Sequence, residues 1–177
     1  MYNTCEISVC DDEWTPFLIG NEINCLKKVG RFQLKEANTQ CQSLNASQIL
    51  PRNSQESDNL VSALLSLDLD SENGNLLVSI GIYQTKEEEW RDFTDQLISF
   101  FDWLPNEPDN YGENENYAGL SINEISWTTH WKSYNGTNEL NVVCTKRSGQ
   151  GKHGPNCTGS WNCTAVVEVN TVSDLLV

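Results

Sequence analysis

In the first quarter of the chain, hydrophobic residues recur at intervals of three or four. The apolar positions that fit one face of a helix are Leu34, Ala37, Cys41 and Leu44. Because an amphipathic helix buries such a face, the pattern predicts a helix over residues 33–44. This helix would present Cys41 to the interior of the domain.

A second helix is predicted to begin directly after Asn53. Asn53 is a favourable N-cap, and Glu56 stands three residues later, where a carboxylate completes a capping box. The buried stripe of this helix would then consist of Leu60, Val61, Leu64 and Leu65.

The hydrophobic pattern changes to a period of two farther along the chain. Over residues 76–83, Val78, Ile80 and Ile82 alternate with small residues, which predicts a strand. Residues 139–145 have strand character as well. Between these strands, residues 86–125 show weak periodicity, many aromatic residues and two prolines, so we expect a long irregular loop.

After the last predicted strand, the glycine-rich residues 146–155 are predicted to be a linker. The expected organisation is therefore an N-terminal arm over residues 1–9, one domain over residues 10–147, and a linker with a C-terminal arm or stem over residues 148–177. A length of 177 residues fits one domain with short arms.

The charge of the chain excludes several classes of partner. Twenty-five acidic against eleven basic residues give a formal net charge of −14. Such a surface repels phosphate backbones and anionic membranes, so nucleic acid is not an expected partner. No stretch approaches the roughly 20 apolar residues needed to span a bilayer, and we expect no direct membrane insertion within this chain.

Seven cysteines favour an oxidising compartment. Their spacing does not match the close pairs of a zinc site, so disulfides explain them better than metal binding. Cys157 and Cys163 could close a small local loop, which would leave Cys5 over; alternatively, Cys5 joins one of these two. Four glycosylation sequons occur, about as many as the three expected by chance, at Asn45, Asn135, Asn156 and Asn162.

Several short segments, in this order, resemble the C-type lectin-like domain family. Residues 79–82 (SIGI) resemble its W-I-G-L strand, and residues 89–95 (EWRDFTD) its E-W-x-W-x-D segment. Residues 103–110 (WLPNEPDN) resemble its W-x-x-G-E-P-N stretch, and residues 114–117 (NENY) its N-E-N-C segment. The resemblance implies an α+β fold in which two helices pack on small antiparallel sheets beside a long irregular loop region.

The resemblance also implies two disulfides. One is Cys10–Cys25, in the N-terminal hairpin of the family's long form, and the other is Cys41–Cys144, from the first helix to the last strand. The family's second loop disulfide is missing, because Tyr117 replaces one cysteine and no cysteine follows before Cys144.

In lectins of this family, a calcium ion is held by the E-P-N residues, the next acid and the Asn-Asp of a W-N-D motif. The resemblance therefore implies a calcium site at Glu107, Asp109 and Glu115, with a cis peptide before Pro108. Residues 87–115 hold ten of the 25 acidic residues and one base. A solvated acidic loop is the alternative interpretation.

The W-N-D position argues against calcium. The two candidate segments are Trp127-Thr128-Thr129 and Trp131-Lys132-Ser133, and neither supplies an Asn followed by an Asp. Lys132 in that place would repel a cation. Calcium is therefore possible but not assured, and the expected ligand-binding residues are Glu107, Asp109, Asn110, Glu115, Thr128 and Thr129.

No sequence motif supports catalysis, so we expect a recognition module rather than an enzyme. Neither His130 nor His153 has a visible catalytic partner. The favoured hypothesis is a secreted or cell-surface module that binds carbohydrate through the Glu-Pro-Asp loop. The alternative is a calcium-independent adhesion or receptor module that binds a cell-surface protein with the same loop surface.

Overall fold

The structure is a computed structural model that describes residues 10–19, 22–109 and 114–148. Within them the elements follow in the order β1 (Thr15–Ile19), β2 (Glu22–Gln33), α1 (Leu34–Ser43), β3 (Ser47–Gln48), α2 (Ser54–Leu65), β4 (Ser71–Glu72), β5 (Asn75–Gln84), β6 (Trp90–Asp92), β7 (Tyr117–Asn123), β8 (Thr129–Tyr134) and β9 (Glu139–Arg147). Two helices and a mixed sheet confirm the predicted α+β class.

The central sheet brings distant parts of the chain together. Its strand order is β1-β2-β9-β5-β7-β8, while β3 pairs with β9, and β4 and β6 pair with β5. The strands pair antiparallel except β5 and β9, which run parallel where Val78 faces Asn141. The buried Asn141 side chain bonds to the backbone of Asp70 and Leu77, which satisfies its amide at this junction.

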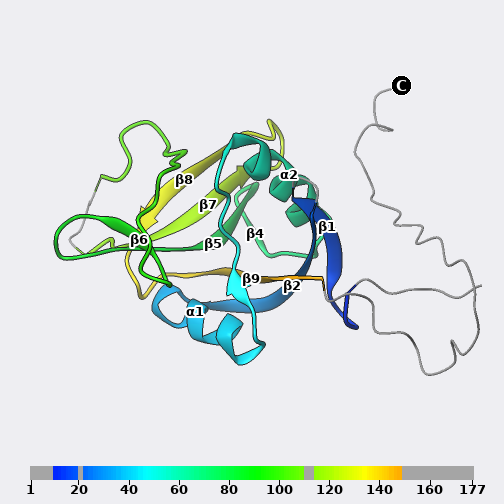
Figure 1. The fold of residues 1–177 in the computed structure, drawn as a ribbon. Helices are drawn as coiled ribbons and strands as arrows, with labels where there is room; N and C mark the ends of the chain where they lie inside the picture. Colours follow the sequence, from blue (N-terminus) through cyan, green and yellow to red (C-terminus); the bar gives the residue numbers. More distant parts are fainter. Residues whose placement is uncertain (1–9, 20–21, 110–113, 149–177) are drawn as a thin grey trace, which may run out of the picture.

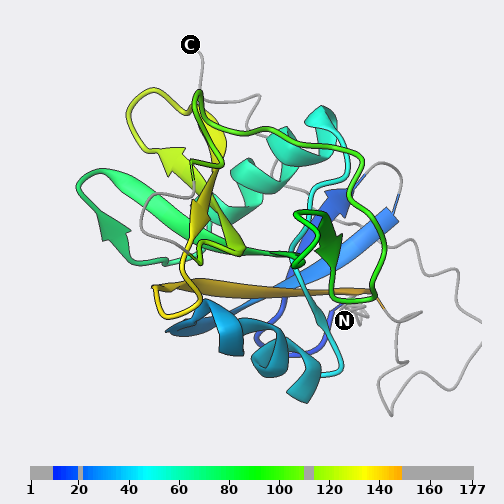
Figure 2. The same ribbon diagram turned by 90° about the vertical axis from the view of Figure 1, so that its left-hand side faces the viewer.

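The two helices lie on opposite sides of the long strands β2 and β9 (Figures 1 and 2). Helix α1 buries Leu34, Ala37 and Cys41, as its periodicity predicts, and the last two pack with Val142 and Cys144 of β9, whereas Leu44 lies just after the helix and is half-buried. Helix α2 buries Leu60, Val61 and Leu64 in the larger core, whereas Leu65 at its end is only half-buried.

The predicted capping box at the start of α2 is confirmed. The Asn53 side-chain oxygen accepts a hydrogen bond from the Glu56 backbone N–H at 2.9 Å, and Glu56 Oε1 accepts one from the Asn53 side-chain NH2 at 3.0 Å. Glu56 also accepts a hydrogen bond from the backbone N–H of Arg52. The first contact satisfies a backbone donor that the helix end leaves unpaired, and the other two fix the chain that leads into the helix.

Strand β5 is buried on both faces, which differs from the alternation expected for it. Val78, Ile80 and Ile82 are buried, and Ser79 and Gly81 are buried as well. The Ser79 hydroxyl hydrogen-bonds with the buried Gln48 side chain from β3. The larger core, which includes helix α2, covers the face with Val78, Ile80 and Ile82, and Gln48 contacts Ser79 and Gly81 on the other face.

Both disulfides that the resemblance implies are present. Cys10–Cys25 joins the chain before β1 to β2, and Cys41–Cys144 joins α1 to β9 across 103 residues of sequence. Cys157, Cys163 and Cys5 lie outside the described residues, as do the predicted N-terminal and C-terminal arms.

The prediction of an irregular loop over residues 86–125 is wrong at both ends. Strands β6 and β7 lie within it, and β7 buries Ala118, Leu120 and Ile122 in the core. The predicted linker also begins too early, because Lys146 and Arg147 extend β9 by pairing with β2. In the described part of the chain, no helix is long and apolar enough to cross a membrane.

Candidate functional site

The irregular loop that remains, between β6 and β7, is anchored by aromatic rings. Trp131 of β8 is fully buried and lies in T-shaped contact with three loop rings, with centroids 5.7 to 6.2 Å apart: Phe100, Phe101 and Trp103. Trp103 also packs on Trp90 of β6, at 4.9 Å. These contacts hold the loop against the sheet without a covalent link.

Backbone hydrogen bonds align the loop with β8. The Trp131 N–H donates to the Asp102 carbonyl at 2.7 Å, and the Leu104 N–H donates to the Trp131 carbonyl at 2.9 Å. A tight turn follows, in which the Glu107 N–H donates to the Leu104 carbonyl. This turn places the Glu107 side chain beside the residues that follow Trp131.

Glu107 makes the central contacts of the site. Its Oε2 accepts hydrogen bonds from the Ser133 backbone N–H at 2.9 Å and from the Ser133 hydroxyl at 2.7 Å. Its Oε1 lies 3.7 Å from the ammonium of Lys132. The Glu107 side chain is only 5% exposed and Ser133 is buried, so their hydrogen bonds are shielded from water, whereas the Lys132 side chain is 44% exposed.

Glu115 and Asp109 lie beside this contact. Glu115 Oε2 is 3.0 Å from the Ser133 hydroxyl, which carries a single proton and cannot donate it fully to both carboxylates. The pKa of Glu115 is raised, chiefly by burial, although the Ser133 hydrogen bond opposes the change; Asp109 and Glu107 raise it further. Glu115 therefore retains a proton more readily than an ordinary glutamate does.

The acidic residues also affect the neighbouring Tyr134. Burial, followed by the negative charges of Glu107, Glu72 and Glu115, raises the pKa of Tyr134 to about 12. The phenol is thus neutral over the physiological range. It gives this end of β8 an uncharged hydroxyl next to a negative cluster.

The residues present do not fit a calcium ion. Calcium requires six to eight oxygen ligands, but both Glu107 oxygens face hydrogen-bond donors or an ammonium group instead. Within residues 10–19, 22–109 and 114–148, no group of three or more acidic, histidine or cysteine side chains is arranged to hold a metal. The peptide bond between Glu107 and Pro108 is cis, as expected.

Of the two segments that the sequence leaves open as the W-N-D position, the structure brings Trp131-Lys132-Ser133 to Glu107. The expected ligand residues Thr128 and Thr129 lie at the other end of β8, beside the turn from β7. There the Thr128 hydroxyl contacts Ser126. The expectation that they share a site with Glu107 needs correction, because the tryptophan that enters the core is Trp131.

The structure describes two of the remaining predicted residues, the sequon residues Asn45 and Asn135. Asn110 lies outside the described residues, as do Asn156 and Asn162. Asn45 is exposed just after α1. Asn135 lies in the turn after β8, where its side-chain oxygen accepts hydrogen bonds from the Thr137 N–H and hydroxyl.

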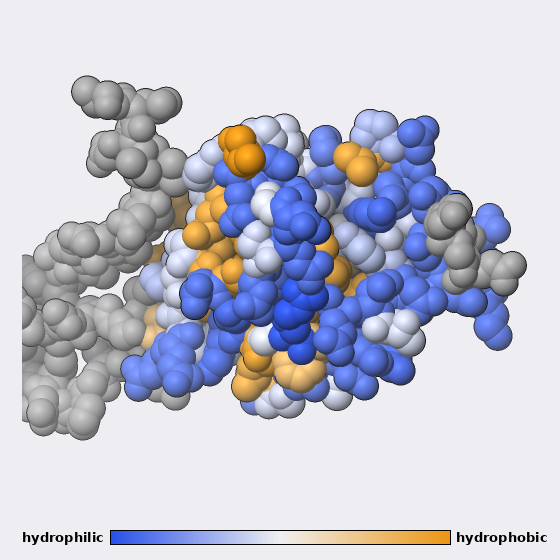
Figure 3. All heavy atoms as spheres, turned by 180° about the vertical axis from the view of Figure 1, so that it is seen from behind, coloured by the Kyte–Doolittle hydropathy of each residue, from blue (hydrophilic) through white to orange (hydrophobic). Residues whose placement is uncertain are grey.

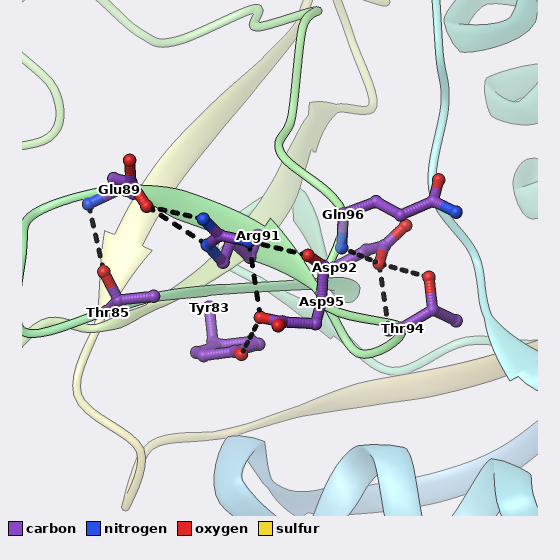
Figure 4. A network of polar contacts seen from close by, with 8 residues as sticks. All are labelled: Tyr83, Thr85, Glu89, Arg91, Asp92, Thr94, Asp95 and Gln96. Atoms are coloured by element: carbon purple, nitrogen blue, oxygen red, sulfur yellow. Dashed lines mark hydrogen bonds and ion pairs between the residues drawn. The ribbon is translucent and has the colours of Figure 1, made fainter.

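A second polar network holds the start of the long loop (Figure 4). Arg91 binds the carboxylates of Glu89 and Asp95, while Asp92 accepts hydrogen bonds from Thr94 and from the Gln96 backbone. These contacts serve the turn itself, so we assign this network a structural role.

The sequence placed Lys132 and Ser133 in one of two candidate W-N-D segments but did not predict them as ligand-binding residues. Two tryptophans four residues apart, each followed by two polar residues, look alike in the sequence. Only burial distinguishes them, because Trp131 is fully buried whereas Trp127 is 56% exposed.

The fold and this loop-against-strand arrangement define a C-type lectin-like domain. Residues 31–146 match the family model described as the lectin C-type domain. This chain therefore belongs to the C-type lectin domain family. Members of this family are generally recognition modules rather than enzymes.

Solved structures support the same fold. The mouse scavenger receptor C-type lectin carbohydrate-recognition domain has a TM-score of 0.62 at 17% identity, covering 79% of this chain and 99% of that one. Murine dendritic cell inhibitory receptor 2, solved with an N-glycan, has a TM-score of 0.60 at 17% identity, covering 78% and 99%. Human lithostathine has a TM-score of 0.63 at 17% identity, covering 78% and 91%. No curated protein sequence matches the chain.

Proposed function

We propose that this chain is an extracellular recognition module that binds carbohydrate at the surface formed by Glu107, Asp109, Glu115 and Lys132. The observation that carries this proposal is the convergence of three carboxyl groups and one ammonium at a single end of β8. Asn110, which follows Asp109 in the sequence, lies outside the described residues, and its part in ligand binding stays a prediction.

The chemistry of the cluster suits sugar hydroxyls. A hydroxyl group both donates and accepts hydrogen bonds; carboxylates supply acceptors and an ammonium supplies donors. Hydrogen bonds with a charged partner are stronger than those between neutral groups. The side chain of Lys132 is 44% exposed, and Asp109 is exposed, so both charges are accessible to a ligand.

Two structural relatives support a glycan ligand by what they were solved with. Dendritic cell inhibitory receptor 2 was solved with an N-glycan, and the SPL-1 structure contains GlcNAc, at 22% identity to this chain. Figure 3, which views one face of this molecule, shows mostly hydrophilic side chains with hydrophobic ones in smaller groups.

The two disulfides support an oxidising location, either a secreted protein or the extracellular part of a membrane protein. In such a compartment the four sequons at Asn45, Asn135, Asn156 and Asn162 become proposed glycosylation sites. Calcium is not needed for the contacts that we propose.

The test is a glycan-array screen of the purified 177-residue chain, followed by calorimetric titration of the best ligand. We expect Asp109→Asn and Glu115→Gln to weaken binding at least tenfold, since each removes a charged acceptor worth roughly 1.5–3 kcal/mol. The matched control is Glu87→Gln, an exposed acid in the same acid-rich stretch. Equal binding by all three variants would contradict the proposed surface.

A protein ligand is the second candidate, favoured by exposed apolar residues on the long loop. Leu97, Phe101 and Leu104 are 58%, 42% and 41% exposed. Aromatic side chains such as that of Phe101 are enriched at protein interfaces, and the exposed leucines add apolar area beside it. In this case Phe101→Ser would abolish binding to a cell-surface partner, whereas Asp109→Asn would leave it intact.

A further inference from the structure

The Lys132 side chain pairs with Glu107, one of the three acidic residues of the cluster. Its ammonium lies 3.7 Å from Glu107 Oε1, and the adjacent Ser133 donates two hydrogen bonds to the other oxygen of the same carboxylate. Two hydrogen bonds from Ser133 and one ion pair from Lys132, consecutive residues of β8, thus converge on one nearly buried carboxylate. Together they tie the Glu-Pro-Asp turn to the sheet.

A nearly buried carboxylate requires compensation, because an isolated ion is costly to remove from water. In the described part of the chain, the ion pair that reaches this cluster comes from Lys132. Other described ion pairs of lysine and arginine lie elsewhere, as with Lys27–Glu13 and Arg52–Asp92. The neighbouring acids Asp109 and Glu115 increase the need for a cation here.

An ammonium group and a divalent metal ion exclude one another at such short range. The ammonium carries only donors and therefore cannot act as a ligand, and its charge repels the metal. A lysine at position 132, where the W-N-D motif has an asparagine, thus removes a potential oxygen ligand of a metal ion and supplies a positive charge instead. Ser133 adds a hydroxyl in place of a further carboxylate.

We propose that the Lys132 ammonium is the resident cation of this site, holding the long loop to β8 where a metal ion would otherwise be needed, so that ligands bind without a divalent cation. The role of Lys132 in holding the loop rests on its ion pair with Glu107. Ligand binding without a divalent cation rests on the proposed function as well.

Thermal melting of the chelator-treated 177-residue chain, with and without millimolar calcium, tests the proposal. We expect the Tm of the wild-type protein to be unchanged by calcium. The double variant Lys132→Asn/Ser133→Asp gains an amide oxygen and a carboxylate and loses the ammonium, so its Tm is expected to rise with calcium and to fall again with chelator. A calcium-dependent rise in the wild-type Tm would overturn the proposal.

Lys132→Met provides a test that does not require the double variant to fold. It keeps the aliphatic stem but removes the charge, so hydrogen exchange at residues 104–109 should become several-fold faster than in the wild type. Lys35→Met, at an exposed position of α1, is the matched control. Unchanged exchange in Lys132→Met would overturn the role of the ammonium.

The two proposals fail differently. If the wild-type chain binds glycan only when calcium is present, the inference about Lys132 falls and the proposed function stands. If the chain neither binds glycan nor responds to calcium, the proposed function falls and the role of Lys132 in holding the loop stands.

Discussion

The ring of Tyr117 lies directly against Gly136. A β-carbon at position 136 would come within 2.7 Å of Tyr117 Cε2 and 3.2 Å of its Cδ2, closer than atoms pack. Tyr117 begins β7, and Gly136 lies in the turn after β8. The large Tyr117 ring thus packs on the smallest residue. This contact links the start of β7 to the turn after β8, where the family's second loop disulfide is missing.

The turn that contains Gly136 also caps helix α1. The carbonyls of Gly136 and Asn138 accept hydrogen bonds from the backbone N–H groups of Lys35 and Leu34, at 3.1 and 3.0 Å. The N-cap residue Gln33 makes no capping hydrogen bond with its side chain. Contacts of Tyr117 with this turn therefore stabilise the start of α1 as well.

Gly136→Ala is expected to destabilise the domain by about 1–3 kcal/mol, because a methyl group must be fitted against a ring that has no room for it. Denaturant unfolding measures this change. The control is the double variant Tyr117→Ala/Gly136→Ala. In the Tyr117→Ala background, Gly136→Ala should lower the free energy of unfolding much less than it does in the wild type. An equal loss in both backgrounds would show that the Tyr117 ring does not limit position 136.

Strong local signals explain which parts of the fold were predictable. The helical spacing around Cys41, the capping pair Asn53 and Glu56, and the apolar run of β5 each fix an element without reference to distant residues. Strand β7 was not predicted, because it directly follows a long acid-rich stretch and was included in the expected loop. Its Gly119 packs under Leu140 and Tyr134, which only the folded sheet brings there.

Asp92 gives a second prediction, on stability at low pH. Burial alone would raise its pKa, but hydrogen bonds from Thr94, Arg52 and the backbone of Gln96 and Thr94 lower it to about 2. Because the folded-state pKa is depressed below the ordinary 3.8, the stabilisation is present above about pH 4 and is lost as the pH falls towards 2.

Asp92→Asn should therefore remove about 2 kcal/mol at neutral pH and flatten the pH dependence of unfolding between about pH 4 and 2. Urea unfolding at a series of pH values measures both effects. Asp95→Asn is the control, because the Asp95 side chain is 78% exposed and pairs with Arg91 at the surface (Figure 4). If the free energy of unfolding falls equally with pH below pH 4 in the wild type and in Asp92→Asn, Asp92 is not the source of the acid sensitivity.

Trp103 is expected to anchor the long loop. Replacement by alanine removes its contacts with Trp90, Phe101 and Trp131 and should cost about 3 kcal/mol. Limited proteolysis should then cut between residues 97 and 107 before the domain unfolds. Trp127→Ala, at an exposed tryptophan, should change stability by no more than about 0.5 kcal/mol. Equal effects of both variants would argue against the anchor.

The candidate site was predictable only in part, for a physical reason. The acids Glu107, Asp109 and Glu115 stand in one short stretch, so their proximity follows from the sequence. Their partners Lys132 and Ser133 reach them through the burial of Trp131. Two equivalent tryptophans compete for that position, and the choice depends on packing against Phe100 and Trp103, which no local pattern reveals.

The two disulfides should differ in their contribution to stability. Cys41–Cys144 closes a loop of 103 residues and packs with Ala37 and Val142, whereas Cys10–Cys25 closes one of 15. Chain entropy alone gives about 4.7 against about 3 kcal/mol for loops of these sizes. We expect Cys41→Ala/Cys144→Ala to lower the free energy of unfolding more than Cys10→Ala/Cys25→Ala, as measured by denaturant titration. The reverse order would mean that the hairpin of β1 and β2, rather than the link from α1 to β9, limits the stability of the domain.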